Sequence, residues 1–160
     1  MSETGMVPKL LVLSLVSSLL FNFCLAEEED LPPLDERVAL CREAAQAGHV
    51  ESMFLMGALC REGYGVEKDS VQAAIWFSLA ARQGDGSSAF YLSEMHLNGE
   101  GVEQDKVAAQ MWAIVAFVKG IKGAEQILTK LNEELTEEQM EQSGLLLGKI
   151  FQQHPEMLGG

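Results

Sequence analysis

Apolar positions recur at helical spacing along most of this chain, and glycine-rich segments interrupt them. Residues 49–62 place their apolar side chains about one helical turn apart, and residues 69–82 do the same after the break at 63–66. The apolar positions are Met53, Met56 and Cys60 in the first stretch and Ala73, Trp76 and Ala80 in the second. One broad residue between two small ones suits close antiparallel packing. The pattern predicts a pair of helices joined by a short loop.

The predicted helix ends carry matching capping signals. Gly63 suits a helix C-terminus because glycine tolerates positive φ. Asp69, with Gln72 three residues later, resembles a capping box at the start of the second helix, and Asp105 begins its later counterpart. Residues 136–139, Thr-Glu-Glu-Gln, predict a capping box for a final helix over 137–153.

The helix pair occurs twice at an offset of 36 residues. Twelve of 36 aligned positions are identical without a gap, including a doubled GxGVExD segment. Residues 35–47 align with a second helix alone, and residues 123–134 align with a first helix. The sequence therefore predicts an all-α fold, an α/α superhelical solenoid of antiparallel helix pairs. Its full repeats span about 48–83 and 84–119, and closing helices occupy 123–153, since terminal units of such arrays are atypical.

The N-terminal stretch has the pattern of a secretory signal. Lys9 precedes an apolar segment that ends at Ala26, and the acidic run 27–30 follows. Its apolar run of about 16 residues would span about 24 Å as a helix, less than the roughly 30 Å of a membrane core. We expect a signal peptide over 1–26, cleaved after Ala26, with an uncleaved anchor as the alternative. The expected location is periplasmic or secreted.

Three further segments complete the predicted organisation. Residues 27–35 form an acidic spacer, 36–153 the repeat domain, and 154–160 a frayed tail. A formal net charge of −13 over 160 residues disfavours nucleic acid and anionic membranes as partners. Instead it favours a protein partner with basic patches.

No group of residues forms a convincing catalytic or metal site. The chain lacks a G-x-S-x-G segment and a serine followed three residues later by lysine. Its three histidines, His49, His96 and His154, lack the spacing of metal ligands. We therefore expect a protein without enzymatic activity, metal or cofactor. Cys41 and Cys60 are expected to be free thiols that act as small apolar residues, although their pairing stays open.

The doubled motif resembles that of the Sel-1-like repeat family, relatives of tetratricopeptide repeats. The two copies read MGALCREGYGVEKDSVQAAIWFSLAARQG over 56–84 and LSEMHLNGEGVEQDKVAAQMWAIVAFVKG over 92–120. Cys60 and His96 replace the usual tyrosine, and Ser93 replaces a glycine. The resemblance implies a right-handed solenoid that binds proteins, as adaptors and regulators of this family do, many of them exported by bacteria. It also leaves a second reading, a periplasmic hydrolase related to cysteine-rich members.

Solenoids of this type present their first helices on the concave side. Five residues there are not required by the predicted core and are candidates for partner binding. They are Leu55, Leu59, Tyr91, Glu94 and Met95. An ordinary solvated helix face is the alternative. The open ends of a short array also allow pairing with a second copy.

Overall fold

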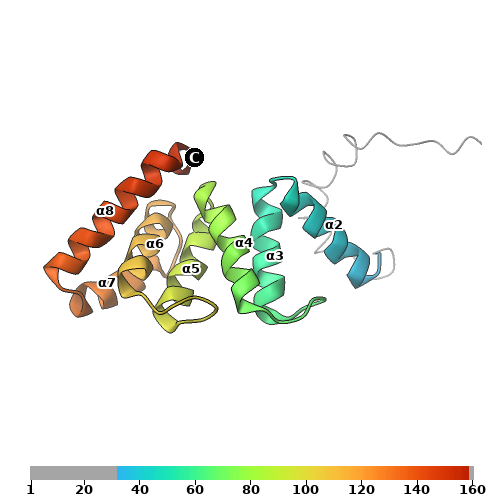
Figure 1. Cartoon of the computed structure of the whole chain (residues 1–160), viewed down its shortest axis with the longest axis horizontal. Coiled ribbons are helices and arrows are strands. Elements are labelled where there is room, and N and C mark those ends of the chain that lie inside the picture. Colours follow the sequence, from blue (N-terminus) through green and yellow to red (C-terminus); the bar gives the residue numbers. More distant parts are fainter. Residues whose placement is uncertain (1–31, 159–160) are drawn as a thin grey trace, which may run out of the picture.

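The computed structural model describes residues 32–158, which form seven α-helices and a short 3₁₀ helix, without a strand in this part. The helices follow one another along an elongated array (Figure 1). They are α2 (Leu34–Gln46), α3 (Val50–Glu62), α4 (Ser70–Arg82), α5 (Gly86–Asn98), α6 (Lys106–Val118), α7 (Ala124–Glu134), α8 (Glu137–Gln153) and the 3₁₀ helix η2 (Pro155–Leu158). The predicted all-α solenoid is confirmed. The predicted signal peptide lies outside the described residues.

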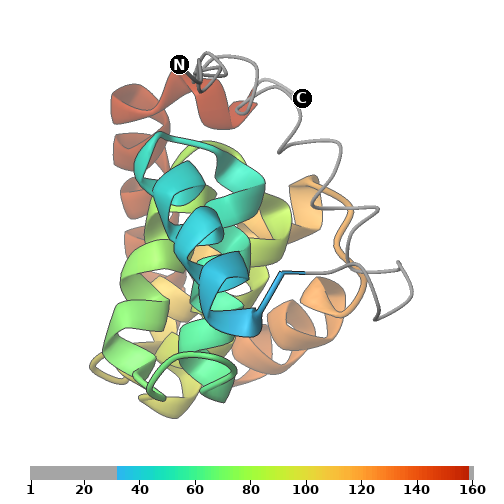
Figure 2. The same cartoon turned by 90° about the vertical axis from the view of Figure 1, so that its right-hand side faces the viewer.

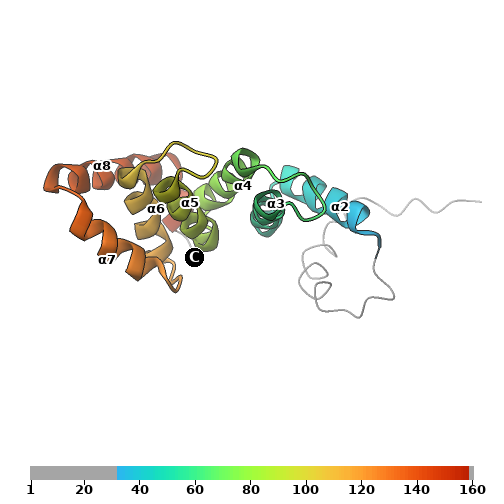
Figure 3. The same ribbon diagram turned by 90° about the horizontal axis from the view of Figure 1, so that it is seen from below.

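Each repeat is a helical hairpin, α3 with α4 and α5 with α6. Consecutive hairpins pack through α4 and α5, and the array continues through α6 and α7. Viewed along the row, the helices stack one behind another (Figure 2). From below, α7 and α8 diverge instead of forming a third hairpin (Figure 3). The last two helices therefore close the array in a different way from the two repeats.

The helix ends follow the signals in the sequence. The carboxylate of Asp69 accepts a hydrogen bond from the backbone N–H of Gln72, and Asp105 caps α6 in the same way. Thr136 and Gln139 form the predicted capping box of α8. Gly63 ends α3 with φ of 75°, in the left-handed region that favours glycine. Local sequence chemistry is therefore sufficient to set these boundaries.

The two hairpins fill the same internal space with different pairs of residues. In the first repeat, the fully buried ring of Phe77 on α4 lies directly over Gly57 on α3. At the equivalent positions of the second repeat, the pair is Ser93 and Ala113, both buried. The Ser93 hydroxyl donates to the carbonyl oxygen of Ala109 at 2.8 Å. The serine at the family's glycine position is thus matched by a small residue on the facing helix.

Each glycine-rich loop also packs against the second helix of the preceding unit. Gly101, with φ of 69°, lies against the backbone of Ser70 at the start of α4. Gly65 has the same φ, and its α-carbon faces Leu34 and Val38 on α2. A side chain at either glycine would intrude on this contact. These close approaches connect neighbouring units beyond the contacts between helices.

The C-terminal segment is ordered, and the expected frayed tail is wrong for its described part. Helix α8 packs on α6, and η2 then packs on α4. Met157 is fully buried in the core, and its backbone lies near Gly84. Burial of an apolar side chain offsets the entropy lost when the tail is held in place. Figure 1 shows the end of α8 reaching toward α4.

Candidate partner-binding site

An aromatic cluster lies where α3, α4 and α5 meet. The ring of Tyr91 stacks on that of Phe77, with centroids 5.1 Å apart and planes 12° from parallel. Phe54 lies 5.8 Å from Tyr91, and Phe90 meets Tyr91 edge-on at 6.0 Å. Aromatic contacts of this kind restrict side-chain motion. Tyr91 is only partly buried, so a well-anchored aromatic ring is available at the surface.

Arg61 covers this ring and connects the two repeats. Its guanidinium carbon lies 5.3 Å from the Tyr91 centroid, within the range of a cation–π contact. Two guanidinium nitrogens donate to the Glu100 carboxylate at distances from 2.8 to 3.2 Å, and Glu94 lies 3.7 Å away. The hydrogen bonds from Arg61 lower the pKa of Glu100, and they raise the pKa of Arg61. The site therefore combines an aromatic face with an ordered group of charges.

Four of the five sequence-predicted residues are accessible, and Met95 is not. Leu55 and Leu59 on α3 and Tyr91 on α5 pack partly against the core, and Glu94 is half-exposed. Met95 is fully buried, so the expectation that the core leaves it free is wrong. The cause is helical phase: Leu92 and Ser88, one and two turns before Met95, face the core as well.

Sequence reasoning missed Arg61 and Glu100. Arg61 lies in the last turn of α3, and Glu100 lies in the loop after α5, 39 residues later. The signal that could have found them is a pair of opposite charges separated by about one repeat length, at the ends of equivalent helices. We define the α3–α5 face as Arg61, Tyr91 and Glu94, which contact one another; Leu55 and Leu59 lie on another side of α3.

The ion pair between Arg61 and Glu100 predicts a pH-dependent stability. The pKa of Glu100 is lowered from 4.5, so the folded protein binds this proton more weakly than the unfolded chain does. The contribution is complete above pH 4.5 and is lost as the pH falls through the lowered pKa. Partial exposure limits it to about 1 kcal/mol. We expect Glu100→Gln to lower the free energy of unfolding by this amount at pH 7.

Urea unfolding of the wild type and Glu100→Gln across pH 2 to 7 measures the effect. The difference between them should disappear in acid, below the lowered pKa. Glu103→Gln is the matched control, because Glu103 is exposed on the same loop and takes part in no ion pair among the described residues. A Glu100→Gln difference that persists unchanged at pH 2 would contradict the assignment.

Both cysteines of the repeat region are free and buried. The Cys41 thiol donates to the carbonyl oxygen of Ser52 at 3.6 Å, and burial raises the pKa of Cys41 to about 11. Burial also raises the pKa of Cys60. A protonated, enclosed thiol is a poor nucleophile. Residues 32–158 hold no group of three or more His, Cys, Asp or Glu side chains that could bind a metal.

The comparisons with known proteins agree with this architecture. The Sel1 repeat family model matches residues 50–85 and 86–116. A crystal structure of a protective antigen of uropathogenic Escherichia coli, displaying an SLR fold, has a TM-score of 0.76 and 30% identity. The match extends over 91% of this chain and 31% of the antigen chain. A Sel1 repeat protein from Oxalobacter formigenes has a TM-score of 0.60 and 34% identity, over 61% of this chain and 28% of that one. No curated protein matches.

The chain thus carries two Sel1 repeats, and the predicted family is confirmed. It spans about a third of the length of the two solved relatives. Sel1 repeat proteins generally act as protein–protein interaction modules, and the family is typically non-catalytic. No helix within residues 32–158 is both long enough and apolar enough to cross a membrane.

Proposed function

We propose that this chain is an exported interaction module, an adaptor or regulator in a bacterial envelope, that binds a partner through its α3–α5 face. The observation that carries the proposal is Tyr91, a partly exposed ring that stacks on Phe77 and contacts the Arg61 guanidinium. Tyrosine and arginine side chains are enriched among residues that dominate binding energy at protein interfaces. Held rings also lose little conformational entropy when a partner binds.

The location in the envelope rests on the sequence pattern of residues 1–30. The chemistry of the partner follows from the face itself. The Tyr91 ring offers apolar surface, and Glu94 is only loosely held by Arg61 at 3.7 Å. Glu94 is therefore available for a lysine or arginine of the partner. An apolar segment flanked by basic residues complements this face.

Affinity capture from envelope extract tests the proposal, with residues 27–160 as bait. We expect a defined partner to be retained by the wild type and reduced at least about tenfold by Tyr91→Ala, as for a residue that dominates an interface. Glu94→Lys should also reduce it, by opposing the partner's basic charge. Glu125→Lys, an exposed reversal at the start of α7, is the matched control. Equal recovery with Tyr91→Ala would refute this face as the binding site.

A separate experiment tests the location. Fractionation of cells that express the full chain should recover, from the periplasm, a product that begins at residue 27. Recovery of the uncleaved chain from the cytoplasm would overturn the envelope part of the proposal and leave the interaction part to be judged by the capture experiment.

A further inference from the structure

Helix α4 exposes an apolar stripe on the side that faces away from its own hairpin. Val71, Ile75 and Leu79 are spaced four residues apart, so they share one face of the helix, and all three are exposed. We call these three residues the α4 stripe. Three large aliphatic side chains in line on one helix differ from isolated exposed apolar residues, which are common on any protein.

Two of the three equivalent positions are buried in the second repeat. At an offset of 36 residues, Ile75 corresponds to Met111 and Leu79 to Val115. Ile75 is 47% exposed and Leu79 is 42% exposed, whereas Met111 and Val115 are 3% and 2% exposed. The main contacts of α6 are with α5, α7 and α8, and those of α4 are with α3, α5 and the short η2. Helix α8 is therefore the element that packs on α6 and has no counterpart on α4.

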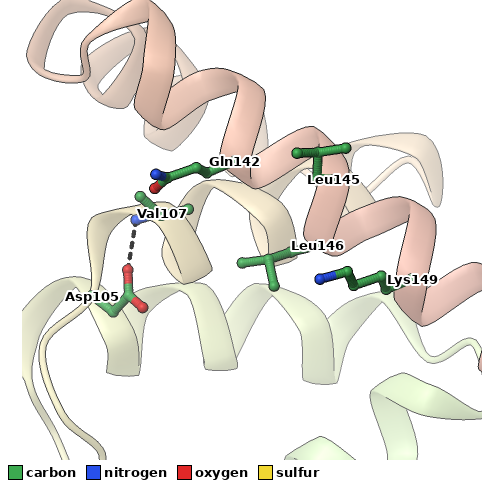
Figure 4. A pocket seen from close by; sticks show the side chains of 6 residues that line it. All are labelled: Asp105, Val107, Gln142, Leu145, Leu146 and Lys149. Atoms are coloured by element: carbon green, nitrogen blue, oxygen red, sulfur yellow. Dashed lines mark hydrogen bonds between the residues drawn. The ribbon is translucent and has the colours of Figure 1, made fainter.

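Two other segments approach the ends of α4. The loop that precedes α6 touches Ser70 at the start of α4, and η2 touches Gly84 just beyond its end. Between α8 and the start of α6 lies a groove of about 340 Å³. It is lined by Asp105, Val107, Gln142, Leu145, Leu146 and Lys149 (Figure 4). Two residues of α8 in this groove, Leu145 and Leu146, are also exposed apolar side chains.

The charged side chains that α4 and the groove lining contribute are cationic apart from Asp105, although the chain as a whole is strongly acidic. Neither α4 nor α6 contains an acidic residue. The Asp105 carboxylate is engaged by the backbone N–H groups of Val107 and Ala108 at the start of α6. Arg82 and Lys149 are exposed and take part in no ion pair within residues 32–158. An acidic ligand would therefore be complementary to this surface.

We propose that the α4 stripe is a second docking site, which binds an amphipathic helix of a partner protein with an apolar stripe and acidic flanks. The helix lies on α4 in the way that α8 lies on α6. The 13 residues of α4 are about 20 Å long, so the docked helix has about three to four turns. This site is distinct from the α3–α5 face and does not depend on it.

Two other occupants are less well matched to the surface. A second copy that docks through the same face would bring Arg82 and Lys149 near their own counterparts and add two chains of charge −13. A bilayer is disfavoured by the same net charge, and the equivalent face of α6 receives a helix. Both occupants are distinguishable by experiment.

Fluorescence anisotropy with a designed peptide tests the proposal. The probe is a fluorescein-labelled helix of about 18 residues, with leucines along one face and glutamates beside them, and its companion carries lysines in place of the glutamates. We expect the glutamate peptide to bind the protein and the lysine peptide to bind at least about tenfold more weakly. Ile75→Gln should weaken binding of the glutamate peptide by about tenfold, because the contact loses buried apolar area.

Three further variants test whether binding depends on the cationic charge and on the position of the apolar residue. Lys149→Glu should weaken the glutamate peptide several-fold and strengthen the lysine peptide. Val118→Gln, an exposed apolar position at the end of α6, and Tyr91→Ala, on the α3–α5 face, should leave binding unchanged. Because these substitutions are at exposed or partly exposed positions, circular dichroism should show an unchanged helical content.

Several outcomes would overturn the proposal. These include the absence of binding of the glutamate peptide, equal binding of the two peptides, and full binding by Ile75→Gln. Sedimentation that shows a dimer abolished by Ile75→Gln would assign the face to a second copy. Flotation with phosphatidylglycerol vesicles that Ile75→Gln abolishes would assign it to a membrane.

Discussion

Replacing Phe77 with alanine is expected to lower the free energy of unfolding by about 3–5 kcal/mol. The ring is fully buried, lies over Gly57 and stacks against Tyr91. Its removal leaves a cavity between α3 and α4, because the backbone of Gly57 offers no side chain to fill the space. Urea unfolding measures the loss, and the helical signal before the transition confirms that the variant folds. A loss below 1 kcal/mol would contradict this packing.

Substitution of Gly57, which faces the Phe77 ring, is a second test of this packing. A Cβ at residue 57 would lie 2.6 Å from Cε1 of the Phe77 ring, so Gly57→Ala should destabilise the wild type by about 1–3 kcal/mol. In the Phe77→Ala background the same change should stabilise, because the methyl group enters vacated space and alanine favours a helix by about 1 kcal/mol over glycine. The sign should therefore reverse. Destabilisation by Gly57→Ala in both backgrounds would refute the contact.

The second large effect is expected at Gly101. Gly101→Ala should lower the free energy of unfolding by more than about 3 kcal/mol. The residue has φ of 69°, which costs a residue with a Cβ about 1–2 kcal/mol. The new methyl group would also overlap the carbonyl of Ser70, and backbone at a helix start cannot move aside as a flexible side chain does. The loop must shift, and the contact between the two repeats is lost.

Gly120→Ala is the matched control for Gly101→Ala. Gly120 follows α6 with φ of 75°, and a Cβ there meets nothing within 4 Å. Its cost should be the backbone strain alone, about 1–2 kcal/mol. The difference in urea unfolding free energy between the two variants therefore isolates the close approach to Ser70. Equal losses for the two variants would show that this approach contributes nothing.

Local signals in the sequence were sufficient for most of the fold. Asp69, Asp105 and Thr136 cap the helices as predicted, and Gly63 ends α3 in the left-handed conformation. These features depend on neighbours within a few residues, which the sequence displays directly. The 36-residue repeat then implied how the hairpins stack, because equivalent residues in adjacent units occupy equivalent places.

Features that depend on distant contacts could not be predicted in this way. Met157 is buried because α8 brings the C-terminal segment onto α4. The α4 stripe is exposed because α8 packs on α6 and not on α4. The sequence analysis expected the core to leave both Tyr91 and Met95 free. Tyr91 is partly exposed, but Met95 is fully buried because the predicted helical phase of α5 was slightly wrong. Arg61 and Glu100 were missed because a pairing across 39 residues has no local signal.

Each hairpin fills its internal space with its own pair of facing residues, and this decides which part of the protein can be transplanted. A hybrid that places α5 opposite α4 in one hairpin would set the Ser93 side chain against the Phe77 ring, which already fills the space up to Gly57. The reciprocal hybrid would set Gly57 against Ala113 and leave a void. A complete hairpin keeps its two matched facing residues together. The unit of exchange, in evolution or in engineering, is therefore the complete helix pair.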